Sequence, residues 1–199
     1  MSAAHTPRLA VFLSGSGRTL VNLAESIARG TPRARIALVV ASKECLGAAR
    51  ARSLGLPVQV QEGDLPLATL DSLLRQHAID WVVLAGYIRL LPIPPGYAGR
   101  IVNIHPALLP EFGGHGMYGK RVHEAVLAAG RSVSGCTVHL CDDQYDRGRI
   151  VLQRTCPVRP GDTPETLAAR VFEQECLAYP EALELLLSGK SKEVGGLAS

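Results

Sequence analysis

The sequence predicts an α/β protein with a three-layer, Rossmann-like open sheet that is mostly parallel and gains antiparallel strands in its C-terminal half. Apolar, β-branched runs alternate with helical patterns, which is typical of parallel β-α-β units with right-handed crossovers. The runs are continuously apolar, as expected for strands buried on both faces. Near residue 145 only a short polar join separates two such runs, which favours an antiparallel pair because a parallel pair needs a longer crossover.

The first hundred residues predict half of a nucleotide-binding α/β fold. Gly30 is expected to end the first helix and Pro66 to lie near the start of the third, since glycine is common after a helix and proline in its first turn. The expected strands are 8–14, 34–42, 57–60, 80–86 and 100–105. The expected helices are 19–30, 45–56 and 66–78.

The second half is expected to begin with a helix at 119–130 and to continue with strands at 134–142 and 148–158. Residues 143–147, with the sequence DQYDR, join the two strands. A join of this length predicts a hairpin or a tight antiparallel turn.

A long helix is expected to close the fold, with Thr163 as its N-cap and Pro164 as its first residue. Pro180 lies inside this helix and is expected to kink or break it, because proline lacks an N–H and its ring clashes with the preceding turn. Residues 188–199 are expected to be a frayed tail.

The bulk properties suit one folded domain over residues 1–199. The chain has 47% hydrophobic and 20% charged residues and a net charge of +3, with Lys and Arg scattered rather than clustered. This pattern predicts neither nucleic-acid nor membrane binding, and no apolar run reaches the roughly 18–20 residues that span a bilayer. The N-terminal stretch does not resemble a signal peptide, so we expect a cytoplasmic protein. Five cysteines without a C-x-x-C pair predict reduced thiols and no metal site.

A glycine-rich turn, SGSGRTL at 14–20, follows the first expected strand and leads into the first helix. Such a turn points backbone N–H groups and a helix N-terminus at an anion. Leu20 stands where a third glycine would complete a dinucleotide motif, and no G-K-[ST] follows, so a phosphate monoester is favoured over a dinucleotide or a triphosphate. The alternative is a tight structural turn.

A second polar feature ends the strand at 100–105. Asn103 and His105 share one face of this strand, and Pro106 follows, so the pair is expected at the carboxyl end of the sheet, where such folds bind ligands. An amide N–H and a protonated imidazole make a good oxyanion site. A nearby carboxylate would raise the pKa of the imidazole, and Asp146 is the candidate. The alternative is that both side chains only bind loop backbone.

Three other features have two interpretations each. His139 is either near the site or a core histidine with satisfied hydrogen bonds. His123 and Glu124 are expected on a helix surface, or else against the site. The glycine-rich segment 111–120 is either a lid or a surface Ω-loop.

Several blocks of sequence occur in an order that resembles the phosphoribosylglycinamide formyltransferase family, from about residue 8 to residue 187. The blocks are VFLSGSGRTL, VVLAGYIRLLP, VNIHPALLPEFGG, SGCTVHL with DDQYDRGRIVLQ, and VRPGDTPETLAARVFEQECLAYP. The resemblance implies a phosphate-binding half at about 8–100 and a catalytic, folate-binding half at about 101–187.

The resemblance also implies a role for individual residues. The catalytic residues would be Asn103, His105 and Asp146. The substrate phosphate and ribose would be bound by Gly17, Arg18, Thr19 and Glu175. The folate would be bound by Ile88, Arg89, Leu90, Leu91, Asn103, Cys141 and Asp142.

The implied reaction transfers the formyl group of 10-formyltetrahydrofolate, a co-substrate, to the amine of glycinamide ribonucleotide, without a metal. The implied partners are these small molecules, with the protein as a monomer or a homodimer. The main rival is formyltetrahydrofolate deformylase, which uses water as acceptor and usually carries a domain before the first strand. Methionyl-tRNA formyltransferase would need a C-terminal RNA-binding domain. A non-catalytic nucleotide-binding protein or a nucleotide oxidoreductase is a further alternative.

Overall fold

The computed structural model describes residues 5–189, which form two compact units. The first unit ends at Val102 and the second begins at Asn103. The predicted frayed tail at 188–199 falls almost entirely outside the described residues.

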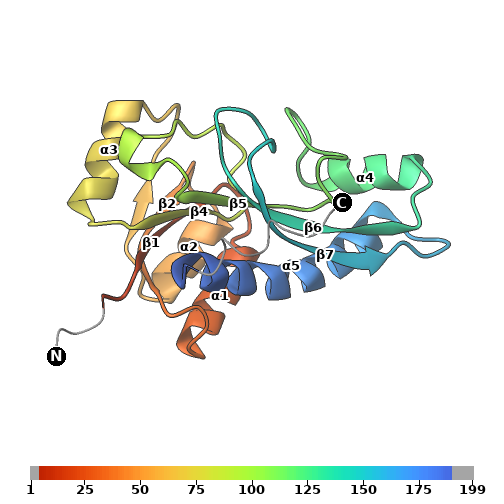
Figure 1. Ribbon diagram of the computed structural model, residues 1–199, viewed down its shortest axis with the longest axis horizontal. Helices are drawn as coiled ribbons and strands as arrows, with labels where there is room; N and C mark the ends of the chain where they lie inside the picture. Colours follow the sequence, from red (N-terminus) through yellow and green to blue (C-terminus); the bar gives the residue numbers. More distant parts are fainter. Residues whose placement is uncertain (1–4, 190–199) are drawn as a thin grey trace. The chain divides into compact units, whose positions relative to one another are not determined.

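The first unit is built from four strands and three helices (Figure 1). Its strands are β1 (Arg8–Leu13), β2 (Arg35–Ala41), β3 (Val58–Val60) and β4 (Trp81–Leu84). Its helices are α1 (Arg18–Ala28), α2 (Leu46–Ser53) and α3 (Leu67–Gln76), and a short 3₁₀ helix, η1 (Pro95–Tyr97), follows. β1 pairs in parallel with both β2 and β4, and β2 pairs in parallel with β3. The predicted half of a parallel α/β fold is therefore confirmed.

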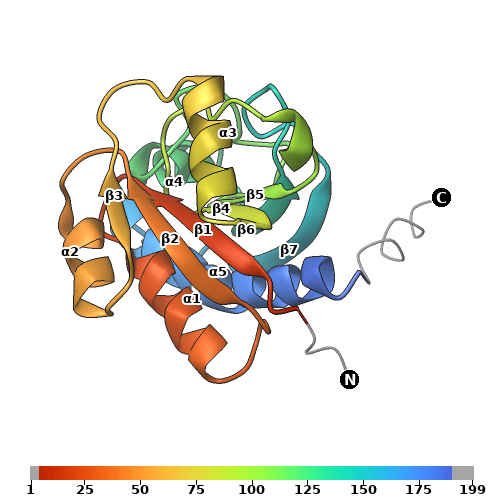
Figure 2. The same ribbon diagram turned by 90° about the vertical axis from the view of Figure 1, so that its left-hand side faces the viewer.

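Helices cover both faces of these four strands. In Figure 2, α3 lies on one face, while α1 and α2, which contact each other, lie on the opposite face. α3 buries Leu70, Leu73 and Leu74, which fall on one side of a helix at this spacing. Between the helices, β1 is buried from Leu9 to Leu13, as its continuous apolar sequence predicts.

The second unit contains the polar end of β5 (Ile101–His105), then α4 (Lys120–Ala128), β6 (Val133–Leu140), β7 (Ile150–Pro157) and α5 (Pro164–Leu187). β6 pairs antiparallel with β7, which confirms the expected antiparallel strands of the C-terminal half. The register of this pair shifts between Val138 and His139. α5 packs against both strands and also contacts α4 (Figure 1).

The long helix α5 begins as the sequence predicts. Thr163 is its N-cap, and the Thr163 hydroxyl accepts a hydrogen bond from the backbone N–H of Thr166, whose own hydroxyl accepts one from the Thr163 N–H. The predicted break at Pro180 is wrong, because α5 continues to Leu187. Proline inside a helix costs about 3 kcal/mol. Buried side chains on each side of it, Tyr179 and Leu183, each contribute about 1.5–3 kcal/mol, so packing outweighs that cost.

Candidate active site

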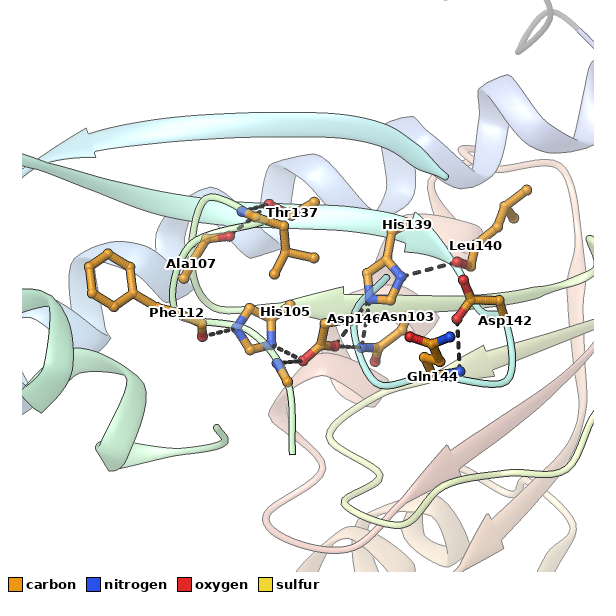
Figure 3. Close-up of polar contacts among 12 residues, drawn as sticks. Asn103, His105, Ala107, Phe112, Thr137, His139, Leu140, Asp142, Gln144 and Asp146 are labelled. Carbon is orange, nitrogen blue, oxygen red and sulfur yellow. Dashed lines mark hydrogen bonds and ion pairs between the residues drawn. The ribbon is translucent and has the colours of Figure 1, made fainter. Parts of the chain in front are cut away.

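Asn103 and His105 lie at the carboxyl end of β5, on the same face of the strand (Figure 3). His105 is buried, with 3% of its surface exposed, and Asn103 is half-buried. Buried polar side chains are normally hydrogen-bonded, so both side chains are expected to have hydrogen-bond partners at this end of the strand.

Asp146, in the loop between β6 and β7, is the carboxylate that these two side chains meet. Its Oδ2 lies 3.4 Å from Nδ1 of His105 and accepts a hydrogen bond of 2.9 Å from the backbone N–H of Gly114. Its Oδ1 lies 3.5 Å from Nδ2 of Asn103. The backbone of Asp146 has a φ of 57°, in the left-handed region that few side chains other than Asp and Asn tolerate. This strained geometry directs the carboxylate at the end of β5.

His105 is held from both sides of its ring. Nε2 lies 2.8 Å from the carbonyl oxygen of Phe112, which only accepts hydrogen bonds, so Nε2 carries a proton and donates it. Nδ1 is therefore the atom that gains or loses a proton, and it faces Asp146. A second proton on this ring would sit between the imidazole and the carboxylate.

The pKa of His105 differs from the sequence expectation. Burial lowers the pKa of the ring, and the charge of Asp146 and the hydrogen bond to Phe112 only partly oppose that effect. The carboxylate is present as expected, yet the net pKa of His105 lies below its ordinary value. Burial raises the pKa of Asp146, but the charge and the donors around it, including His105 and the backbone N–H of Gly114, outweigh burial and hold that pKa below its ordinary value.

His139, on β6, joins the same cluster. Its Nε2 lies 3.1 Å from Nδ2 of Asn103 and 3.4 Å from Oδ1 of Asp146, and the side chain is 2% exposed. Its Nδ1 lies 3.1 Å from the carbonyl oxygen of Leu140. Of its two interpretations, the structure supports the one near the site.

The glycine-rich segment contributes backbone groups to this cluster. Besides the Phe112 carbonyl and the Gly114 N–H, it is tied to the rest of the second unit by an ion pair of 2.7 Å between Glu111 and Arg131. The guanidinium of Arg131 also lies over the ring of Phe112, 5.9 Å from its centroid. These contacts hold the segment against His105 and Asp146.

The backbone contacts could not be predicted from residue types, because every residue has a carbonyl and nearly every one an N–H. The only sequence signal for them is the density of glycines between Gly113 and Gly119. A Cβ at Gly113 would lie 3.1 Å from Cβ of Asp146 and would overlap the side chain of Leu109. Glycine at this position therefore lets the segment approach Asp146 closely.

His123 is buried rather than on the helix surface, which corrects that expectation. It is 4% exposed on α4, and its Nδ1 has no hydrogen-bond partner. Burial, together with the nearby His105, lowers the pKa of His123. Glu124 is exposed, and its carboxylate lies 3.7 Å from Lys120.

The turn SGSGRTL lies in the first unit, between β1 and α1, as predicted. Gly17 is the N-cap of α1, with a φ of 72°, and Arg18 and Thr19 form the first turn. A Cβ on Gly17 would lie 2.6 Å from Cα of Gly47, so this position must be glycine. No side chain caps this helix N-terminus, which suits an anion at the first-turn N–H groups.

The segment 88–91, also in the first unit, is mixed in character. Ile88 and Leu90 are each 49% exposed, whereas Leu91 is buried. Arg89 donates a hydrogen bond to the carbonyl oxygen of Gly63. The segment therefore exposes two apolar side chains to solvent, while the side chain of Arg89 is bound to the backbone of Gly63.

The remaining predicted site residues belong to the second unit. Cys141 and Asp142 begin the loop after β6, and Oδ1 of Asp142 accepts a hydrogen bond of 2.9 Å from the backbone N–H of Gln144. Burial raises the pKa of the Cys141 thiol to about 12, so the thiol is protonated and unreactive. Glu175 is half-buried on α5.

All five cysteines are free thiols, as predicted. Within residues 5–189, no group of three or more His, Cys, Asp or Glu side chains is placed to hold a metal ion. In the same range, no helix is long and apolar enough to cross a membrane.

The sequence pattern of the family described as Formyl transferase matches residues 7–183. The chain belongs to the formyl transferase family. Among similar formyl transferases, "Phosphoribosylglycinamide formyltransferase, chloroplastic" of Arabidopsis thaliana is 41% identical over 204 residues, covering 96% of this chain and 70% of that protein. The "Trifunctional purine biosynthetic protein adenosine-3" of Gallus gallus is 39% identical over 191 residues, covering 92% of this chain and 18% of that protein.

The formyl transferase fold is also found in solved structures. That of "glycinamide ribonucleotide transformylase 1" from Symbiobacterium toebii matches with a TM-score of 0.84 and 34% identity, covering 94% of this chain and 90% of that one. This match confirms the predicted fold class, and the family match confirms the predicted resemblance.

Proposed function

We propose that this formyl transferase moves the formyl group of 10-formyltetrahydrofolate to the amine of 5'-phosphoribosylglycinamide, giving formylglycinamide ribonucleotide and tetrahydrofolate in de novo purine biosynthesis. The observation that carries the proposal is the cluster at the end of β5. There, in a chain of this family, the carboxylate of Asp146 lies 3.4 Å from the imidazole of His105 and 3.5 Å from the amide of Asn103. The names of the similar proteins support the glycinamide enzyme within the family.

The proposed reaction begins with attack of the substrate amine on the formyl carbon. A C–N bond forms, the carbonyl oxygen becomes an oxyanion, and the amine nitrogen becomes positively charged. The proton on that nitrogen then passes to N10 of the folate, the C–N10 bond breaks, and tetrahydrofolate leaves. Atoms and charge balance without a metal or a redox partner.

The developing oxyanion is the species that Asn103 and His105 are proposed to stabilise. Nδ2 of Asn103 supplies an N–H and the protonated ring of His105 supplies a positive charge on the same face of β5, and fixed donors and charges beside a developing negative charge lower the barrier. Asp146 favours the proton on Nδ1 by its charge. An oxyanion beside Nδ1 adds a second negative charge and raises the pKa of His105 further as the reaction proceeds.

Substrate binding is proposed from each unit separately. In the first unit, Gly17, Arg18 and Thr19 bind the substrate phosphate at the N-terminus of α1, and the segment 88–91 provides apolar contacts to the folate. In the second unit, Glu175 contacts the ribose, and Asn103, Cys141 and Asp142 contact the pterin. Holding both substrates together supplies a large part of the rate enhancement, because it makes a bimolecular step effectively unimolecular.

We propose one formyltransferase domain over residues 1–199, acting on small molecules as a monomer or a homodimer, without nucleic acid, membrane or metal. The cytoplasm stays the predicted compartment, although similar plant proteins are named as chloroplastic.

The test is a folate assay with purified protein. The protein is mixed with 10-formyltetrahydrofolate, with and without glycinamide ribonucleotide, and tetrahydrofolate formation is followed by absorbance. Product that depends on the nucleotide supports the transferase. Product formed at the same rate without the nucleotide means a deformylase, and no product in either case contradicts the proposal.

A further inference from the structure

We propose that His139 is a positioning residue for the formyl transfer: it holds the side-chain amide of Asn103 in the orientation that presents an N–H to the oxyanion. The inference deepens the proposed function and rests on it. It is carried by three contacts of one buried ring, with Leu140, Asn103 and Asp146 (Figure 3).

The first contact sets the tautomer of His139. Its Nδ1 lies 3.1 Å from the carbonyl oxygen of Leu140, which only accepts hydrogen bonds, so Nδ1 carries the proton and donates it. In the neutral ring, Nε2 is then a lone-pair acceptor. A hydrogen bond from one ring nitrogen to a backbone carbonyl is the usual way in which a protein fixes which nitrogen is available.

The second contact sets the orientation of the Asn103 amide. Because Nε2 of His139 is an acceptor, the atom of Asn103 that lies 3.1 Å from it must be the donor, Nδ2. Turning the amide over would place the Oδ1 of Asn103 against both this lone pair and Oδ1 of Asp146, so two repulsive contacts disfavour that orientation.

The third contact brings Nε2 of His139 to 3.4 Å from Oδ1 of Asp146, so that Nδ2 of Asn103 lies as a donor between two acceptors. Asp146 does not orient the amide by itself. Nδ2 of Asn103 carries two hydrogens, and His139 takes the one with the shorter contact. Asp146 lies at 3.5 Å from the same nitrogen, the limit of a hydrogen bond. The second N–H is thus weakly held, and it is the one available to an oxyanion.

The local fold places His139 for this purpose. The register of the β6–β7 pair shifts between Val138 and His139, and irregularities of this kind change the direction of a side chain at a functional site. The His139 ring is 2% exposed, so it holds its position without competition from water.

The tautomer can be tested directly by ¹⁵N NMR of histidine side chains in the wild-type protein near pH 7, with His139→Gln used to assign the signal. The inference predicts a neutral ring with protonated Nδ1 and unprotonated Nε2. A ring with a proton on Nε2, whether neutral or cationic, would overturn it, because Nε2 could then not accept from Asn103.

The functional test compares two replacements of His139. His139→Leu removes the acceptor, whereas His139→Gln keeps an acceptor oxygen on a side chain of similar reach. Around metal sites, removing a group that orients a reacting side chain lowers activity by about 10- to 100-fold. We expect kcat to fall by that factor in His139→Leu with KM for both substrates nearly unchanged, and His139→Gln to recover most of the loss.

A double-mutant cycle with Asn103→Ala shows whether His139 acts through Asn103 or independently of it. When one residue acts through another, the effects of the two substitutions are not additive. In the Asn103→Ala background, His139→Leu should lower kcat by less than about threefold. An undiminished loss in that background would overturn the inference. Absence of formyl transfer by the wild-type protein would contradict the proposed function instead, and the NMR experiment would still decide the tautomer.

Discussion

Nδ1 of His105 lies 3.4 Å from Oδ2 of Asp146, and the two side chains are only 4% and 9% exposed. Since Nε2 of His105 already donates to the Phe112 carbonyl, Nδ1 is the one atom of the ring at which a proton can be exchanged. The charge of Asp146 and the burial of the ring act on the pKa of His105 in opposite directions. Their balance decides how much imidazolium is present when substrates bind.

Replacing His105 by alanine should remove most of the formyl transfer. Loss of one donor to an oxyanion lowers kcat by about 100- to 1,000-fold, and we expect at least that loss for His105→Ala in the folate assay. The melting temperature should show a folded protein. His77→Ala, which removes a histidine ring at the end of α3, is the matched control and should keep wild-type turnover. Near-normal turnover by His105→Ala would remove its assigned role.

Asp146→Asn should change the pH dependence of the reaction. Asparagine tolerates the left-handed backbone at this position, so the loop should keep its shape. Without the carboxylate, the pKa of His105 loses an influence that raises it and falls further. If imidazolium is the active form, the decline of kcat/KM with rising pH should move to lower pH. An unchanged profile would argue against the coupling of the two residues.

Stability should fall on the acid side of neutrality. The pKa of His105 in the folded protein lies below its usual value near 6.5, so between these two values the unfolded chain binds more protons. The free energy of unfolding therefore decreases as the pH is lowered through this window. The depressed pKa of Asp146 acts with the same sign at lower pH, below its usual value of 3.8.

Urea denaturation at pH 7.5, 6.5 and 5.5 measures this effect. The pKa of His123 is lowered by burial as well, so two histidines contribute with the same sign. We expect the unfolding midpoint to drop with acidity, and to drop less steeply in His105→Gln and in His123→Gln than in the wild type. A midpoint that rises as the pH falls would contradict the direction of both pKa shifts.

The phosphate turn makes a separate prediction in the first unit. Gly17→Ala places a Cβ in a left-handed residue, 2.6 Å from Cα of Gly47, and should distort the turn. The KM for glycinamide ribonucleotide should rise by about 10-fold or more, which corresponds to the loss of about 1.4 kcal/mol of phosphate binding. The KM for the folate should change less. Gly15→Ala, at which a Cβ meets nothing within 4 Å, is the matched control. Equal effects of the two variants would contradict a specific role for Gly17.

Much of the fold could be predicted because the determining signals are local. Continuous apolar runs such as 8–14 and 34–42 become buried parallel strands, and helix spacing and caps such as Thr163 mark helix bounds. Pro180 is the exception, because the burial of Tyr179 and Leu183 is a tertiary effect that no local rule contains.

The site could be predicted only in part. Asn103 and His105 share a strand, so their common face follows from the sequence alone. The contacts of the Phe112 carbonyl and the Gly114 N–H could not be predicted in this way, since backbone groups are the same in nearly every residue. The direction of the His105 pKa shift could not be predicted without knowing how deeply the ring is buried. Burial disfavours the charged ring more than the charge of Asp146 favours it.

Following the formyl group itself distinguishes transfer to the nucleotide from hydrolysis. Wild-type protein is given 10-formyltetrahydrofolate labelled with ¹⁴C in the formyl carbon, together with glycinamide ribonucleotide, and the label is separated into nucleotide and formate. The proposed function predicts label in formylglycinamide ribonucleotide, equal in amount to the tetrahydrofolate released, and its loss in His105→Ala. Label recovered as formate, or transfer that persists in His105→Ala, would contradict it.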